Sequence, residues 1–134
     1  MLTHKDYCDY EACVALREMG YDGYCAAYYH LFDNDDDARN SFEYAYGFDF
    51  QNSNNIYRVG APLLYQAQKW LREEKQSEIV VHSFDYVGEP YFADIHMYRE
   101  VRCACSYADS YEEALLEGIK EAVKILKENE TIHE

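Results

Sequence analysis

Two histidines and an aspartate in the second half of the chain have side chains that could bind zinc or transfer protons. His82 and His96 lie in two predicted strands, 78–87 and 91–98, and Asp94 is close to His96 along the chain. With a suitable register, both imidazoles would share one face of a sheet with the carboxylate. Register cannot be read from a sequence, so two ordinary strand histidines are the simpler interpretation. We therefore predict no metal, no cofactor and no catalytic residue here.

A second acidic pattern resembles the start of a calcium-binding loop. Asp33, Asp35 and Asp37 alternate as the first calcium ligands of such a loop would. The sixth position is Ala38, where the loop needs glycine, and the twelfth is Tyr44, where it needs glutamate. We therefore predict that residues 33–41 form a solvated polar loop.

The cysteines predict reduced thiols rather than disulfides or a metal site. Their number is odd, and the first residues lack the basic and then apolar order of a signal peptide. We expect a cytoplasmic protein with small buried thiols. The set is Cys8, Cys13, Cys25, Cys103 and Cys105.

Charge and motif content exclude several classes of function. A formal net charge of −14 opposes nucleic-acid binding, which depends on Lys and Arg contacting phosphates. No apolar run is long enough for a membrane span, no serine sits in a nucleophile elbow, and no glycine-rich loop precedes a helix. We expect a protein that is not an enzyme and has neither nucleic acid nor membrane as a partner.

Aromatic residues occupy every second position between residues 42 and 50. In one extended strand their rings would share a face, as the core side of a sheet or as a platform for a planar ligand or a partner. The 15 tyrosines favour a recognition surface, because a phenol hydroxyl needs water or a partner. Our candidate binding residues are Phe42, Tyr44, Tyr46 and Phe48, together with Arg39 and Arg58.

The pattern of elements predicts an α+β domain over residues 1–134, with a mostly antiparallel sheet and three helices packed on it. The expected order is α-β-β-α-β-β-(β)-α. In chain order we expect a helix at 9–20, strands at 25–32 and 42–50, a helix at 61–75, strands at 78–87 and 91–98, and a helix from Ser110 onwards. Residues 101–106 form either a third strand or a continuation of the second past a kink near Glu100.

Several residues mark the ends of these helices. Asp9 suits an N-cap, and Gly20 can close the first helix in a left-handed conformation. Pro62 suits the first turn of the central helix, and Ser110 with Glu113 has the pattern of a capping box.

The central helix and the last helix each have an apolar stripe. We expect Trp70 to bury most of its ring, and residues 130–134 to fray. The last helix should bury Leu115, Ile119, Ala122, Ile125 and Leu126.

Segments in all three predicted helices and their flanks resemble a group of small uncharacterised acidic proteins from gut Bacteroidales and their phages and prophages. The resemblance implies a phage-linked accessory protein that modulates or counteracts its host, and it implies no functional residue. It is carried by Tyr10-Glu11, Leu16, Glu18, Gly20-Tyr21-Asp22, Cys25, Tyr28-Tyr29, Ala61-Pro62, Leu64, Ala67, Lys69-Trp70-Leu71-Arg72-Glu73, Tyr111-Glu112-Glu113-Ala114 and Ile119-Lys120.

Two hypotheses of different classes follow. The first is an interaction protein, which could form a homodimer, with an acidic, tyrosine-rich surface for a host protein. The second is a binder of a small planar ligand such as a nucleotide signal, with rings stacked on the base and arginines on the phosphates. The arginines available for that role are Arg39, Arg58, Arg99 and Arg102.

Overall fold

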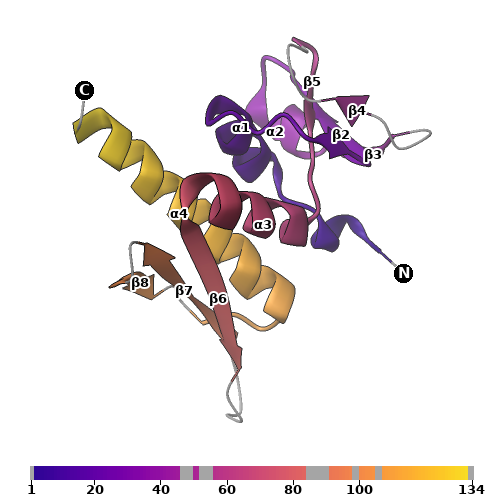
Figure 1. The fold of residues 1–134 in the computed structure, drawn as a ribbon. Helices are drawn as coiled ribbons and strands as arrows, with labels where there is room; N and C mark the ends of the chain where they lie inside the picture. Colours follow the sequence, from indigo (N-terminus) through magenta and orange to yellow (C-terminus); the bar gives the residue numbers. More distant parts are fainter. Residues whose placement is uncertain are drawn as a thin grey trace. The chain divides into compact units, whose positions relative to one another are not determined.

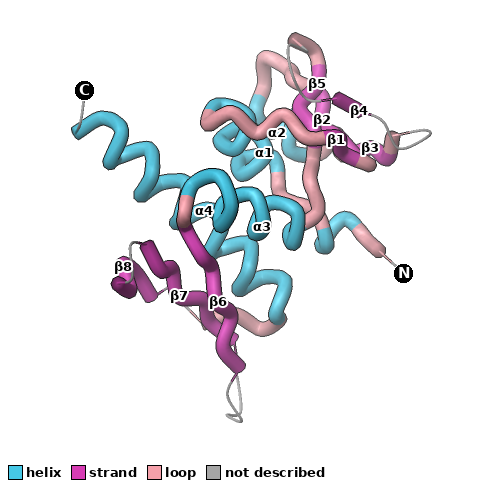
Figure 2. The backbone as a smooth tube through the Cα atoms, viewed as in Figure 1, coloured by secondary structure: helices cyan, strands magenta, loops and turns pink. Residues whose placement is uncertain are grey.

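A computed structural model describes residues 2–45, 50–51, 56–83, 91–97, 100–104 and 107–132 (Figure 1). Helices and antiparallel strands are combined in it, which confirms the predicted α+β class (Figure 2). By its internal contacts the chain divides into two compact units, Met1–Leu63 and Leu64–Glu134. The single domain expected from the sequence stays a prediction, and the units are described separately.

The first unit contains short strands and two α-helices. Strand β2 is the centre of a three-stranded antiparallel sheet of order β3-β2-β5, and β1 pairs with β4. Helix α1 contacts β5 and α2, and α2 contacts β2. The elements are η1 (His4–Asp6), α1 (Tyr10–Glu18), β1 (Tyr24–Cys25), β2 (Ala27–His30), α2 (Asp35–Arg39), β3 (Glu43–Tyr44), β4 (Phe50–Gln51) and β5 (Arg58–Gly60).

Both predicted ends of α1 are confirmed. The Asp9 carboxylate accepts a hydrogen bond of 2.9 Å from the backbone N–H of Ala12, as an N-cap does. Gly20 has a φ of +105°, and the N–H of the following Tyr21 donates to the Leu16 carbonyl at 2.9 Å. This is the Schellman arrangement, in which a left-handed residue lets the chain turn back on the helix end.

Replacing Gly20 with alanine is expected to destabilise α1 by about 1–2 kcal/mol, because a Cβ disfavours the left-handed conformation. Hydrogen exchange of the α1 amides measures this loss locally. Gly20→Asn is the matched control, since asparagine tolerates this conformation better and should lose less. Equal protection in wild type and Gly20→Ala would contradict the assigned role.

The interior of the first unit contains three thiols among aromatic rings. Cys8, Cys13 and Cys25 are free and buried, as the sequence predicted. The Cys13 thiol donates to the Cys8 carbonyl at 3.4 Å. Burial raises the pKa of the Cys25 thiol to about 12, so it is protonated at neutral pH. These cysteines are small core residues.

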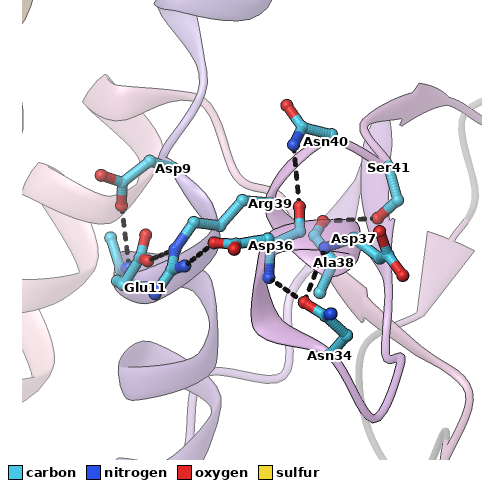
Figure 3. A network of polar contacts seen from close by, with 10 residues as sticks. Asp9, Glu11, Asn34, Asp36, Asp37, Ala38, Arg39, Asn40 and Ser41 are labelled. Carbon is cyan, nitrogen blue, oxygen red and sulfur yellow. Dashed lines mark hydrogen bonds and ion pairs between the residues drawn. The ribbon is translucent and has the colours of Figure 1, made fainter.

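Two predictions for the first unit are wrong. Residues 33–41 were expected to be a loop, but 35–39 form helix α2, because the Asn34 side chain accepts hydrogen bonds from the N–H groups of Asp36 and Asp37 (Figure 3). The single strand expected at 42–50 is replaced by β3 and β4, which pair with different strands. Residues 46–49 lie outside the described part of the chain.

In the second unit, two helices pack on one face of an antiparallel sheet of order β6-β7-β8. Helix α4 contacts β6 and β7, and α3 contacts β6 and α4 (Figure 1). The predicted hairpin pairing and third strand are confirmed, while the connection at Gly88–Pro90 is outside the described residues. The elements are α3 (Leu64–Lys75), β6 (Ser77–Ser83), β7 (Tyr91–Met97), β8 (Glu100–Ala104) and α4 (Tyr111–Ile132).

Helix α3 begins later than predicted. Pro62 lies two residues before its first residue, Leu64, because the Pro62 carbonyl accepts the backbone N–H of Cys8 at 2.9 Å. Leu64, Ala67 and Leu71 of its apolar stripe are buried. Trp70 is partly buried beneath the Lys75 ammonium group, which lies 5.7 Å from the ring centroid.

Helix α4 begins where the capping pattern placed it. The Ser110 hydroxyl accepts the N–H of Glu113 at 3.1 Å. The predicted stripe is buried at Leu115, Ile119 and Ala122, whereas Ile125 is only partly buried, like Leu126. The helix continues to Ile132, and the fraying expected at residues 130–134 stays a prediction. Among the described residues, no helix has the length and apolar character needed to cross a membrane.

Candidate functional site

The outer face of strand β2 carries several side chains that can take part in binding. Tyr28 lies opposite Glu43 of β3, and His30 lies opposite Arg58 of β5. Because side chains alternate along a strand, these four residues share one face of the sheet. The intervening Tyr29 is buried on the other face.

A carboxylate joins the ring-bearing residues of this face. The Tyr28 hydroxyl donates to Glu43 Oε2 at 2.7 Å, and His30 Nε2 lies 3.2 Å from the same oxygen. The Arg58 guanidinium carbon is 4.7 Å from the centroid of the Tyr28 ring, which is cation–π distance. The tyrosine, the imidazole and the carboxylate thus hold one another in a fixed arrangement at the surface.

An open pocket of about 530 Å³ lies beside this network. The Phe32 ring is 51% exposed and stacks on His30, with ring centroids 5.7 Å apart and an interplanar angle of 20°. The described residues of its lining include carboxylates and rings, and none of them is a lysine or an arginine. The lining residues are His30, Phe32, Asp37, Asn40, Ser41, Phe42 and Glu43. We call Tyr28, His30, Phe32, Asp37 and Glu43 the acidic aromatic surface.

The hydrogen bonds of Glu43 alter its titration. The Tyr28 hydroxyl, and after it His30, stabilise the carboxylate and lower the pKa of Glu43 below its ordinary value of 4.5. The same bond with Glu43 raises the pKa of the Tyr28 phenol. Glu43 therefore carries its negative charge throughout the neutral and mildly acidic range.

Replacing Tyr28 with phenylalanine is expected to raise the pKa of Glu43 towards 4.5, which a ¹³C NMR titration of the carboxyl group measures. Because the folded-state pKa is the lower one, the bond favours the folded chain above pH 4.5, and this contribution disappears as pH falls through the folded-state pKa. Tyr24→Phe, at an exposed tyrosine, is the control and should leave Glu43 unchanged. An unaltered Glu43 titration in Tyr28→Phe would contradict the contact.

The two arginines predicted as ligand-binding residues have different surroundings. Arg39 of α2 hydrogen-bonds to Glu11 of α1 through Nε and to Asp36 Oδ1 at 2.8 Å (Figure 3). Arg39 therefore joins two helices and is absent from the pocket lining. Arg58 lies over the Tyr28 ring at the edge of the acidic aromatic surface.

The predicted rings are divided between the core and the surface. Phe42 is partly buried, with its centroid 5.3 Å from that of Tyr7 and 5.5 Å from that of Tyr29. Tyr44 packs on Phe42 at 5.1 Å but is 54% exposed. Tyr46 and Phe48 lie outside the described residues. The rings at 42 and 44 thus belong to one aromatic cluster, and Phe42 also reaches the pocket.

His82 and His96 lie on one face of the sheet of the second unit, together with Asp94, which is the arrangement that a suitable register would give. His82 pairs with Phe92, Asp94 with Val80, and His96 with Glu78. His82 Nε2 lies 2.9 Å from Asp94 Oδ2, but the atoms do not have hydrogen-bond alignment, and Nε2 is buried without such a partner in the described part of the chain.

The His82 ring stacks on Phe92 at 4.8 Å. Within the residues that the structure describes, no group of three His, Cys, Asp or Glu side chains is placed to hold a metal ion. The side chain of Cys103 and the whole of Cys105 are outside this part.

The chain matches no protein-family model, and comparisons with curated proteins and with solved structures find no similar protein. The functional argument therefore rests on the geometry of the residues described above.

Sequence reasoning missed most of the acidic aromatic surface. Tyr28, His30 and Phe32 stand at alternate positions of a predicted strand, which was a usable signal for a shared face. Glu43 lies between two of the rings of residues 42–50 and is not among the candidate binding residues predicted from the sequence. The signal that brings Glu43 to Tyr28 is the pairing of β2 with β3, which local pattern does not specify.

Proposed function

We propose that this chain is a non-enzymatic interaction protein that binds a basic segment of a partner protein through the acidic aromatic surface. The observation that carries the proposal is the open pocket in which Phe32 and His30 stand beside the carboxylates of Asp37 and Glu43. Exposed rings provide contact area at low entropy cost, and carboxylates select a positively charged partner.

The charge of the first unit supports a basic partner. Residues 1–63 contain 11 acidic and 4 basic side chains. Two of those basic residues, Arg39 and Arg58, already contact carboxylates or a ring of the same unit. A surface with this excess of negative charge accelerates encounter with positively charged partners and repels phosphates.

The cellular role follows from the resemblance to proteins of gut Bacteroidales and their phages. On that basis the proposed partner is a host protein, and the chain is a phage- or prophage-linked accessory protein acting in the host cytoplasm. A second copy of the chain is a less suitable occupant of the pocket, because both copies carry the same negative charge.

Site-specific crosslinking tests the proposal. A photoreactive phenylalanine analogue at position 32, in the full chain, should crosslink in a Bacteroidales lysate to a lysine- or arginine-rich segment of one protein. The same analogue at Tyr65, an exposed position in α3, is the matched control and should not capture that segment. Capture from position 65 alone, or of an acidic segment from position 32, would reject the proposal.

A small planar ligand such as a nucleotide is the second candidate, because the stacked His30 and Phe32 rings offer it a platform. Its phosphates would face Asp37 and Glu43, which is why we place it second. Thermal-shift measurements with nucleotides and cyclic nucleotides test it. Stabilisation by one of them that Phe32→Ala abolishes would reverse the order of the two candidates.

A further inference from the structure

Three side chains of the pocket offer hydrogen-bond acceptors that no described residue occupies. Glu43 Oε2 is engaged by Tyr28 and His30, whereas Oε1 has no partner in the described part of the chain. The Asp37 side chain is exposed, and its carboxylate has no hydrogen-bond partner among the described residues, while its backbone N–H donates to the Asn34 side chain. Asn40 uses its Nδ2 to donate to the Asp36 carbonyl, which leaves its side-chain oxygen as an acceptor.

The hydroxyl group of Ser41, another lining residue, already has both a donor and an acceptor as partners. The Ser41 hydroxyl accepts the N–H of His30 at 2.8 Å and donates to the Ala38 carbonyl at 2.6 Å. A ligand with several N–H donors and a positive charge therefore matches the open positions at Asp37, Asn40 and Glu43.

The aromatic side of the pocket restricts the shape of this cation. Half of the Phe32 side chain is exposed, and its stacking on His30 holds the ring in place. A planar guanidinium can lie flat on such a ring while its edge donates to carboxylates. A lysine ammonium is a compact, strongly hydrated charge with three donors, so it uses the ring less well.

The same unit already holds two of its own guanidinium groups by these two kinds of contact. Arg39 donates hydrogen bonds to the carboxylates of Glu11 and Asp36, and Arg58 lies over the ring of Tyr28. The pocket combines both elements, an aromatic face and carboxylates, and none of its described lining residues is an arginine.

We propose that the pocket receives an arginine side chain of the partner protein, with the guanidinium stacked on Phe32 and hydrogen-bonded by Glu43 and Asp37. This assignment rests on the proposed function and specifies the chemistry of its partner. Arginine is preferred over lysine at this position because only arginine satisfies the ring and the carboxylates together.

Calorimetric titration of the full chain with three peptides tests the assignment. The peptides are identical except for a central arginine, lysine or citrulline, where citrulline keeps the shape of arginine but has no charge. The arginine peptide should bind about fivefold or more tightly than the lysine peptide, and the citrulline peptide should bind most weakly. Glu43→Gln and Phe32→Ala should each weaken arginine binding about five- to tenfold.

One control variant, and the choice of glutamine at position 43, guard against trivial explanations. Glu117→Gln removes one charge from an exposed position of α4 and should leave the affinity unchanged. Glutamine at position 43 can still accept the Tyr28 hydrogen bond, so the local structure is retained.

The outcomes separate the two proposals. Equal affinity for arginine and lysine peptides, both reduced by Glu43→Gln, would overturn the arginine assignment while leaving the basic-partner proposal standing. Affinity that neither Glu43→Gln nor Phe32→Ala alters would overturn the location of the pocket. If no cationic peptide binds and position 32 crosslinks to a neutral segment, both proposals are overturned.

Discussion

Replacing Ile119 with alanine is expected to lower the free energy of unfolding by about 2–5 kcal/mol. Ile119 is fully buried on the side of α4 that packs on the sheet of the second unit. Truncation would remove its apolar contacts and leave a cavity that the close-packed interior fills only partly. Urea unfolding followed by the fluorescence of Trp70, the only tryptophan and in the same unit, measures the loss.

The matched control is Ile125→Ala on the same helix. The sequence assigned Ile119 and Ile125 to one inward stripe, but Ile125 is only partly buried. Its side chain therefore loses less contact with water on folding, and truncating it should lower the free energy of unfolding clearly less. Similar losses at the two positions would contradict the observed orientation of α4.

Replacing Gly118 with alanine is expected to destabilise the chain by about 1–2 kcal/mol, although alanine is the better helix former by about 1 kcal/mol. A Cβ at this position would lie 2.6 Å from Ile79 Cγ2 and 3.0 Å from Ala93 Cβ. Both neighbours are buried strand residues that cannot move aside freely. The absence of a side chain at Gly118 thus sets how closely α4 approaches β6 and β7.

A double-mutant cycle tests this contact directly. In an Ile79→Ala background, where Cγ2 is gone but Ala93 Cβ remains, Gly118→Ala should destabilise clearly less than it does in the wild-type chain. Glu117→Ala, at the exposed neighbouring position, should change stability by no more than about 0.5 kcal/mol. A stabilising effect of Gly118→Ala in the wild-type background would contradict the close packing.

Features that depend on neighbouring residues could be predicted from the sequence. The N-cap at Asp9, the left-handed Gly20 and the start of α4 at Ser110 all use a side chain or backbone conformation within a few residues. The pairing of β6 with β7 was also predictable, because two strand patterns are separated by a short turn segment.

Features that depend on distant pairing could not be predicted. The run 42–50 has the alternation of one strand, yet β3 pairs with β2 whereas β4 pairs with β1. Gln76 takes a left-handed φ of 55° after α3 with no glycine to indicate it. The pocket depends on β2 meeting both β3 and α2, so Glu43 and Asp37 reach His30 only through the tertiary structure.

The predicted binding residues also show the difference between local pattern and distant contacts. The alternation of rings predicted Phe42 and Tyr44 as binding residues. The contacts of Phe42 with Tyr7 and Tyr29, and with Tyr44, make it mainly a packing residue. Substitution of Phe42 would therefore confuse folding with binding. Phe32 and Glu43 are better probes of the surface, because both are exposed.

The most direct test of the central claim is a ¹H–¹⁵N NMR titration of the full chain with the arginine-containing peptide. The account predicts that the peptide shifts the backbone resonances of residues 28–43, which include His30, Phe32 and Glu43. The resonances of residues 64–134 should keep their positions. Shifts confined to residues 64–134, or no shift at any residue, would contradict the claim that the acidic aromatic surface binds a cationic partner.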